Sequence, residues 1–471
     1  MNIRDFISNK RWTAIKEKTL LLWNAAKEQV IKIYDSIQND KLKQGLLQAI
    51  PFWTAAAITG VLAVLYAQLF LFAEKGALRI YENHRWTLFI LTPVCFLVAR
   101  WLVERFAPYA RGSGIPQVMT SIELATPKNY HLIKRLLGIR IIVIKILSSV
   151  VMVLGGGIIG REGPTIQIAG SVFKKINAIL PEWWPKVSRK NVIVAGAASG
   201  LAAAFNTPLG GIVFAIEELS KTHLNYFKSA LFTGVIIAGL AAQGMLGPYL
   251  YLGYPNLQNL SLSVFLGLIV VALVAGYAGG LMNKAILFML DRAAMLRQRK
   301  KQVHFVLFCA FLVATAGFFF GPDALGSGKE VMQRTLFTED KYVDWYTPLL
   351  RANGLIFSFT SGAAGGLFAP SLGIGASIGS VFADLLHYTG SNANLIILAG
   401  MVAFLTGITH SPFTSAILVL EMTDRHNVIF HLILAGMIAN LATNVVGTQS
   451  IYEQLKQQYL KEVQGEQNGG Q

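Results

Sequence analysis

Cysteine and charged residues are both scarce in this sequence of 471 residues. Only Cys95 and Cys309 are present, both lie in apolar stretches, and neither has a Cys or His close to it in sequence. A disulfide framework and a structural metal site are therefore not expected. Charged residues make up 14% of the chain, against about a quarter in an average soluble domain. Together with 54% hydrophobic residues and a mean hydropathy of +0.50, this excludes a disordered chain and argues against a large soluble enzyme.

Acidic residues are fewer than basic ones: 25 Asp and Glu accompany 41 Lys and Arg, a formal net charge of +16. Such an excess is found in proteins that bind nucleic acid, anionic lipid or an anionic substrate. Membrane proteins, however, also collect Lys and Arg in their cytoplasmic loops. We attribute most of the excess to that rule and expect no nucleic-acid partner. We place in the cytoplasm the basic loop that contains Arg292, Arg297, Arg299, Lys300 and Lys301.

The first 46 residues lack a long apolar run, so we expect no secretory signal peptide. Apolar side chains such as Ile15, Leu22 and Ile33 follow helical spacing, with Lys and Arg between them. Residues 1–46 are therefore predicted to form a cytoplasmic amphipathic helix, which lies on the membrane surface or against the rest of the protein.

From about residue 47 onward, long apolar stretches alternate with short polar breaks, and many stretches are interrupted by glycine or proline. Several are too short or too broken to be simple membrane-spanning helices, which need about 20 apolar residues. Irregular backbone inside a membrane is tolerated only where protein encloses it or where it lines a cavity. We therefore predict an all-α polytopic membrane protein in which the glycine-rich breaks mark an internal path.

An internal repeat divides the apolar part of the chain. The stretch FNTPLGGIVFAIEE around Pro208 matches THSPFTSAILVLEM around Pro412, and the two stretches are 204 residues apart. Paired, interrupted apolar segments of this kind indicate a transporter whose site lies between the repeats, although the sequence leaves open whether the repeat is inverted. The predicted organisation is residues 1–46 as the N-terminal helix, 47–250 and 251–455 as two membrane repeats, and 456–471 as a polar cytoplasmic tail.

Three short motifs share one design, in which glycines break a helix and a proline follows that is suited to the first turn of a new helix. Each would direct free backbone N–H groups and the positive end of a helix dipole at whatever lies before it. Three such ends that converge in a membrane predict a site for a small anion. The motif residues are Gly112, Ser113, Gly114, Ile115 and Pro116 in GSGIP, Gly160, Arg161, Glu162, Gly163 and Pro164 in GREGP, and Gly366, Leu367, Phe368, Ala369 and Pro370 in GGLFAP.

In this order and spacing, the three motifs resemble the signature stretches of the CLC family of chloride channels and chloride/proton exchangers. The resemblance covers about residues 50–455 and is closest to bacterial members without C-terminal regulatory domains. It implies two structurally repeated halves with broken, tilted helices, whose re-entrant N-termini meet at a central anion site. It also implies a homodimer in the bacterial inner membrane, with a pathway in each subunit and both termini in the cytoplasm.

The resemblance assigns roles to individual residues. Ser113, Tyr452 and the backbone N–H groups of Leu367 and Phe368 would hold chloride, and a serine in the first motif resembles chloride-preferring rather than nitrate-preferring members. Glu162 would be the external gate and proton acceptor. The Glu217-Glu218 pair ends an apolar helix, and adjacent helical residues point about 100° apart, so both cannot face one path. The resemblance makes Glu218 the internal proton-transfer glutamate.

The residues taken alone allow structural alternatives. Ser113 is also a typical helix N-cap, and Tyr452 a typical interfacial aromatic. A carboxylate at membrane depth is functional by default, but Glu162 could instead pair with Arg161. Lys145 lies in an apolar run, where it either influences the anion path or extends its ammonium group to the membrane surface. Met119 stands where a bacterial relative has a carboxylate, which predicts a changed network below the first motif.

The leading hypothesis is a chloride/proton antiporter without cofactors, with chloride, protons and the lipid bilayer as its partners. A passive, voltage-gated or pH-gated chloride channel of the same family is the alternative, and the presence of Glu218 favours the antiporter. An intramembrane enzyme would need a nucleophile with a base or a metal cluster, and the sequence contains neither pattern. A GxGxxG spacing at Gly155, Gly157 and Gly160 lies between apolar helices and not in a βαβ unit, so it does not predict dinucleotide binding.

Overall fold

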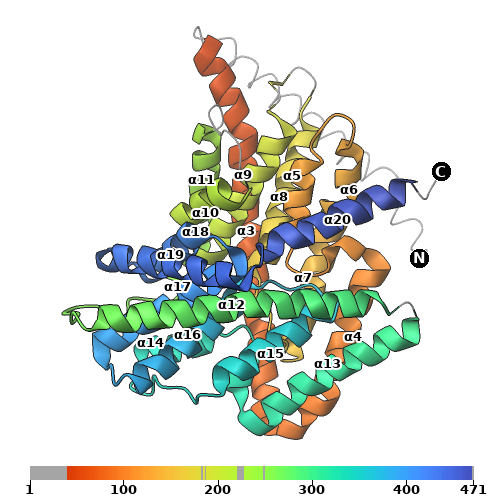
Figure 1. The fold of residues 1–471 in the computed structure, drawn as a ribbon. Helices are drawn as coiled ribbons and strands as arrows, with labels where there is room; N and C mark the ends of the chain where they lie inside the picture. The colour runs from red at the N-terminus through yellow and green to blue at the C-terminus, as the bar shows by residue number, and fades with distance from the viewer. Residues whose placement is uncertain are drawn as a thin grey trace, which may run out of the picture. The chain divides into compact units, whose positions relative to one another are not determined.

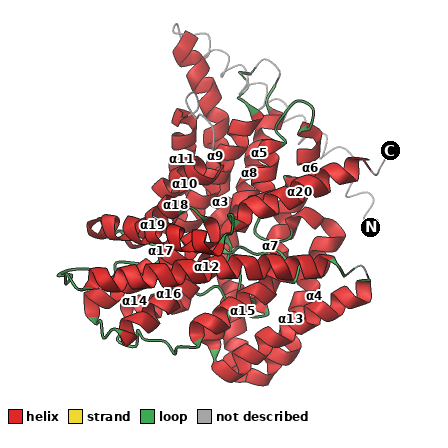
Figure 2. Ribbon diagram, in the orientation of Figure 1, coloured by secondary structure: helices red, strands yellow, loops and turns green. Residues whose placement is uncertain are grey.

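The computed structural model describes residues 40–181, 184–185, 187–219, 228–247, 250–296 and 298–468. This part of the chain is helical and contains no strand, only two isolated backbone bridges (Figures 1 and 2). The predicted N-terminal amphipathic helix falls almost entirely on residues 1–39, which lie outside the described residues. The all-α prediction is confirmed for the part that is described.

The helices up to the middle of the chain include both long apolar helices and short, broken ones. In chain order they are α3 (Asp40–Asn83), α4 (Leu88–Phe106), α5 (Ile115–Glu123), α6 (Ile133–Leu136), α7 (Ile139–Leu154), α8 (Glu162–Ile179), α9 (Arg189–Phe205), α10 (Pro208–Phe214) and α11 (Lys228–Leu246). A π-helical turn, Ala215–Leu219, follows α10 directly.

The remaining helices repeat this mixture of lengths. They are α12 (Val264–Ala294), α13 (Arg299–Phe320), α14 (Lys329–Phe337), α15 (Thr347–Thr360), α16 (Phe368–Leu385), α17 (Gly390–Thr409), α18 (Pro412–Thr423), α19 (Ile429–Val446) and α20 (Ile451–Asn468). The predicted repeat boundary at residue 250 lies in the connection between α11 and α12. The predicted polar tail from residue 456 continues helix α20, on which Tyr459 and Val463 are buried.

Eight of the described helical segments are long and apolar enough to cross a membrane, which makes the chain a multi-pass membrane protein. The long helix α12 packs against α17 and α19, and α16 packs against α17 (Figure 1). Helix α17 is surrounded by protein along 94% of its most apolar window. An apolar helix buried on all sides is consistent with a central position in a membrane-embedded core.

Two of the long apolar stretches are broken at equivalent places. The residues that cap the C-termini of α9 and α17 are Asn206 and His410, and both have a left-handed φ of 58°. A proline opens the next helix in each case, Pro208 in α10 and Pro412 in α18. A left-handed residue ends a helix, and a proline without an N–H group fits the first turn of the next one.

The two short helices that follow these breaks cap each other. The carboxylate of Glu421 accepts hydrogen bonds from the backbone N–H groups of Leu209 at 3.0 Å and Gly210 at 2.6 Å, in the first turn of α10. In return, Glu217 accepts from the N–H groups of Phe413 at 3.2 Å and Thr414 at 2.6 Å, in the first turn of α18. Each carboxylate satisfies N–H groups that have no partner within their own helix.

The chain divides into two compact units. One comprises Met1–Pro51 with Pro181–Lys186, and within it the indole Nε1 of Trp184 donates to the carbonyl of Leu47 at 2.7 Å. The other comprises Phe52–Leu180 with Val187–Gln471. All three glycine-proline motifs lie in the second unit.

Candidate functional site

Each of the three motifs ends in the start of a helix. Helix α5 begins at Ile115, directly after Gly114, whose φ of 101° is accessible to glycine but strained for other residues. Helix α8 begins at Glu162 and α16 at Phe368. The N–H groups of the first turn of each helix have no intrahelical acceptor, so the predicted helix ends are present at all three motifs.

Short backbone hydrogen bonds join the three motifs. The N–H of Gly112 donates to the carbonyl of Ala363 at 2.9 Å, and the N–H of Gly365 donates to the carbonyl of Gly112 at 3.1 Å. Gly160 and Gly366 exchange a reciprocal pair of bonds at 2.8 and 2.7 Å. The third motif is therefore fixed to both of the others, although 253 residues separate Gly365 from Gly112 and 206 separate Gly366 from Gly160.

The first and second motifs approach each other at backbone distance. A Cβ atom added to Gly163 would collide with the hydroxyl and the backbone of Ser113, and one added to Gly114 would lie 2.9 Å from the carbonyl oxygen of Gly163. Only glycine allows this approach, because a contact below 3.0 Å to backbone forces the chain apart. The N-termini of α5 and α8 are thereby held against each other.

Two buried hydroxyl groups lie at this junction without a hydrogen-bond partner among the described residues. They belong to Ser113, which is 1% exposed, and Tyr452, which is 0% exposed. Ser113 is close enough to interact with the Tyr452 hydroxyl, but the two groups do not meet the geometry of a hydrogen bond. Buried polar groups without protein partners are rare and point to a ligand or ion. The pair is therefore suited to donating both protons to one small anion.

The structural alternatives for these two residues are wrong. The N-cap of α5 is Gly114, and no side chain caps this helix, so Ser113 does not act as a cap. Tyr452 is fully buried, so it is not an interfacial aromatic exposed to lipid headgroups. Its ring lies 6.0 Å from that of Phe368, between centroids. Phe368, in turn, packs edge-on against Phe205 and Phe214, both at 6.3 Å.

The carboxylate of Glu162 lies at the N-terminus of α16. Its Oε2 atom accepts a hydrogen bond from the N–H of Ala369 at 3.4 Å, and its Oε1 atom accepts one from the hydroxyl of Tyr251 at 3.5 Å. Glu162 is 1% exposed, and no ion pair joins it to Arg161 among the described residues, so the salt-bridge alternative is not supported. A negative charge here occupies the same kind of helix end that would attract an anion.

Sequence reasoning missed two residues beside Glu162. Tyr251, in the connection before α12, packs its ring edge-on against Phe205 at 5.0 Å. The ammonium group of Lys329 lies 4.6 Å from the centroid of the Tyr251 ring and within electrostatic range of Glu162. Burial, followed by the charge of Arg161, lowers the pKa of Lys329. No local motif surrounds Tyr251 or Lys329, so only the fold places them beside Glu162.

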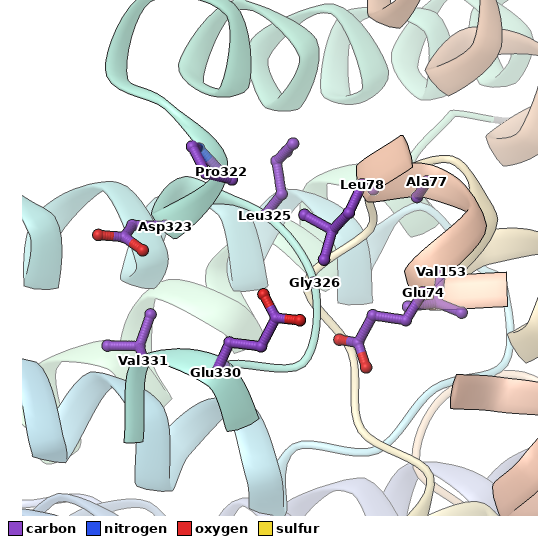
Figure 3. Close-up of a pocket in the computed structure, with 12 residues that line it drawn as sticks. Glu74, Ala77, Leu78, Val153, Pro322, Asp323, Leu325, Gly326, Glu330 and Val331 are labelled. Atoms are coloured by element: carbon purple, nitrogen blue, oxygen red, sulfur yellow. The ribbon is translucent and has the colours of Figure 1, made fainter. Parts of the chain in front are cut away.

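The residues on either side of Lys329 in sequence, Gly328 and Glu330, line a small acidic cavity of about 30 Å³. Figure 3 shows Glu74 from α3 and Glu330 from α14 on opposite walls, whereas the carboxylate of Asp323 points away from them. Burial, followed by the negative charges of Glu74 and Asp323, raises the pKa of Glu330. Glu74 is held by the backbone N–H of Ser327, which donates to its carboxylate at 2.6 Å.

Glu218 is buried as well. Its carboxylate accepts hydrogen bonds from the hydroxyls of Ser411 at 2.6 Å and Ser450 at 3.3 Å. The neighbouring Glu217 turns toward α18 and caps it, as the 100° separation of adjacent helical residues requires. Both glutamates lie in the π-helical turn, a feature that is often found at functional sites.

The side chain of Tyr452 is within electrostatic range of both Glu218 and Glu162. Ser450, which donates to Glu218, is only two residues before it in sequence. Both carboxylates therefore interact electrostatically with the buried hydroxyl of Tyr452.

Lys145 fixes the backbone that precedes Ser113. It is 0% exposed, and its ammonium group donates to the carbonyls of Ala110 at 2.9 Å and Gly112 at 2.8 Å. The alternative in which this side chain extends to the membrane surface is wrong. Met119, on α5, is buried and supplies no charge to balance Lys145.

The chain was compared with known proteins. The family model described as voltage gated chloride channel matches residues 95–444. The H(+)/Cl(-) exchange transporter ClcA of Klebsiella pneumoniae (strain 342) is 30% identical over 454 residues, which cover 92% of each chain. The relative of the same description from Cronobacter sakazakii (strain ATCC BAA-894) is 29% identical and matches 87% of this chain and 90% of its own.

Two solved structures have the same fold. A slow cyanobacterial Cl-/H+ antiporter aligns with a TM-score of 0.74 at 23% identity and covers 88% of this chain and 98% of its own. A CLC-type fluoride/proton antiporter aligns with a TM-score of 0.72 at 19% identity, over 87% and 98% of the two chains. With the family model matching most of the sequence, the chain belongs to the voltage gated chloride channel family, the CLC family that the three motifs indicated.

Proposed function

We propose that this protein exchanges chloride for protons across the membrane. The observation that carries the proposal is the position of the Glu162 carboxylate on the first turn of α16, next to two buried hydroxyls that lack protein partners. The curated relative from Klebsiella pneumoniae, named as an H(+)/Cl(-) exchange transporter, supports the same activity.

Chloride would be held by Ser113, Tyr452 and the N–H groups of Leu367 and Phe368. Hydroxyl and backbone donors are suited to a transported ion, because a helix end carries only about half an elementary charge and binds less tightly than a desolvated cation. Transport requires binding that is strong enough to admit the ion and weak enough to release it. Lys145 would not touch the ion, because its side-chain nitrogen donates to the carbonyls of Ala110 and Gly112.

Glu162 would act as the gate that links the two ions. When ionised, its carboxylate competes with chloride for the N-terminus of α16. When protonated, it loses this attraction and leaves the position to chloride. Because one carboxyl group performs both steps, proton uptake at Glu162 and anion entry become coupled.

Glu218 would carry protons between Glu162 and the cytoplasm. It is 7% exposed, at a membrane depth where a carboxylate is costly and functional by default. This residue favours exchange over the passive chloride channel of the same family, because a channel has no need for a second buried proton acceptor. Two serine hydroxyls donate hydrogen bonds to its carboxylate and hold it in place.

The protein would be a homodimer in the bacterial inner membrane, with one pathway in each subunit. Both termini would face the cytoplasm, on the same side as the basic loop at Arg299, Lys300 and Lys301. The excess of Lys and Arg in that loop follows the positive-inside rule.

Two substitutions test the proposal in liposomes in which chloride and pH are recorded together. Glu162→Ala is expected to move chloride while losing proton movement, because the carboxyl group that takes up the proton and competes with chloride is gone. Glu218→Gln is expected to abolish proton movement and keep chloride flux. Chloride-driven proton pumping by either variant would overturn the assignment. Glu339→Gln, an exposed substitution, is the matched control and should behave as the unmodified protein.

A further inference from the structure

A basic cleft of about 650 Å³ lies where α4 ends and α7 begins, and it shares no residue with the ion site. Its cations come from α6, α7 and α8, and we define it by Lys134, Arg135, Arg140, Lys174 and Lys175.

The cleft concentrates positive charge. Five Lys and Arg residues line it, and none of its lining residues is acidic. Lys134 is close enough to repel the charge on Lys174, whose ammonium group donates to the carbonyl of Leu137 at 2.7 Å. Lys134, Arg140 and Lys175 are exposed and have no hydrogen bond or ion pair among the described residues. Like charges gathered in this way repel one another, and an anion bound between them removes that cost.

The rim of the same cleft is apolar and exposed. Phe106, at the end of α4, is 49% exposed, and Ile139, at the start of α7, is 59% exposed. The ring of Trp101 packs edge-on against Phe106 at 5.5 Å between centroids. Aromatic residues of this kind are typical of the boundary between hydrocarbon and headgroups. A ligand that fits both parts of the cleft has an anionic head and an apolar body.

The position of the cleft fits a membrane surface. The apolar segment Arg85–Phe106 ends at the cleft, and the apolar segment Tyr130–Leu154 has its first residues in it. Helix α8 begins at Glu162, and its C-terminal half lines the cleft with Ser171, Lys174, Lys175 and Ala178. A group of five cations at the ends of membrane spans belongs to the cytoplasmic side by the positive-inside rule.

We propose that the basic cleft binds the phosphate headgroup of an anionic phospholipid in the cytoplasmic leaflet. The exposed ends of Lys134, Arg140 and Lys175 contact the phosphate, and the acyl chains lie along Phe106 and Ile139. A free phosphate would use the cations but would leave the apolar rim in water. Clusters of Lys and Arg next to membrane helices recognise anionic lipids with about 1 kcal/mol per residue.

The test uses the full-length protein in detergent with three additives: phosphatidylglycerol, phosphatidylcholine or inorganic phosphate. Native mass spectrometry counts bound lipid, and thermal unfolding reports stabilisation. The test variant combines Lys134→Gln, Arg140→Gln and Lys175→Gln. The control combines Arg299→Gln, Lys300→Gln and Lys301→Gln, which removes the same charge from exposed positions at the start of α13.

Phosphatidylglycerol is expected to bind and stabilise the unmodified protein and the control, whereas the test variant binds it at least tenfold more weakly. Phosphatidylcholine and inorganic phosphate should have little effect. Equal binding of phosphatidylglycerol by the test variant and the control would overturn the proposal, as would equal stabilisation by inorganic phosphate. If the triple variant does not fold, the single variants decide, because each should weaken binding about fivefold.

Discussion

Two buried hydroxyls and two buried glutamates determine the chemistry of this site at the scale of single residues. The hydroxyls of Ser113 and Tyr452 have no hydrogen-bond partner among the described residues, whereas each glutamate accepts a hydrogen bond from a hydroxyl or N–H group. The contrast separates their roles: the free hydroxyls can donate to an anion, and the partnered carboxylates are held in place. The contacts of the Glu162 carboxylate with Ala369 and Tyr251, at 3.4 and 3.5 Å, are long for hydrogen bonds, which is consistent with a group that moves.

The Tyr251 hydroxyl is expected to stabilise the seated carboxylate of Glu162 against competition from chloride. Tyr251→Phe keeps the ring packing on Phe205 and removes the donor. Losing this long bond is worth about 1 kcal/mol, so the variant should bind chloride up to about fivefold more tightly. Isothermal titration of chloride in detergent measures this. Tyr254→Phe, at an exposed tyrosine, should leave the affinity unchanged, and an unchanged affinity in Tyr251→Phe would contradict the role.

Glu330 is expected to make stability depend on pH. Its pKa is raised in the folded protein by burial and by Glu74 and Asp323, so the folded state binds a proton more tightly than the unfolded state. Its contribution to stability is therefore present below pH 4.5, the reference pKa of the group, and is lost as the pH rises. Glu330→Gln should melt higher than the unmodified protein near pH 7.5, with the difference disappearing near pH 4.5. Thermal unfolding in detergent at both pH values tests this, and a difference independent of pH would refute it.

At the scale of helices, the site is built from helix ends. Helices α5, α8 and α16 begin at the three motifs, and the bonds between Gly112, Gly160 and Gly366 and their partners hold these ends together. The reciprocal caps of α10 and α18 place the two halves of the repeat against each other. Glu217 therefore stabilises the fold, whereas its neighbour Glu218 faces Ser411 and Ser450.

Removal of either reciprocal cap is expected to reduce stability by a similar amount. Glu217→Ala and Glu421→Ala each leave two first-turn N–H groups without an acceptor, and loss of a cap costs about 0.5–2 kcal/mol. Both variants should melt at a lower temperature in detergent than the unmodified protein and keep the coupling of chloride to protons. Loss of proton movement in Glu217→Ala, with chloride flux intact, would show that the wrong glutamate had been assigned to proton transfer.

The helix ends were predictable from the sequence because glycine and proline act locally. The breaks at the three motifs and the openings of α10 and α18 at Pro208 and Pro412 follow from the conformations these residues allow. The sequence alone left Ser113 open to a capping role, which the unpaired hydroxyl removes. Tyr251 and Ser411 were not predictable, because 89 and 193 residues separate them from the glutamates they contact. The π-helical turn around Glu218 has no signature in sequence either.

At the scale of the whole molecule, the site needs both halves of the chain. Ser113, Glu162 and Glu218 precede residue 250, whereas Leu367, Phe368 and Tyr452 follow it. The first half supplies both candidate proton acceptors but only one of the candidate anion donors, and the second half supplies the others. Because the sequence contains few charged residues, the two buried glutamates are conspicuous.

The central claim is that chloride and proton movements are coupled in this chain. The most direct measurement places the purified, unmodified protein in liposomes with a chloride gradient and no pH gradient, and records both ions. If the two movements are coupled, chloride flowing down its gradient will drive protons in the opposite direction until a pH difference builds up. Chloride flux that generates no pH difference would contradict it and would identify a passive channel.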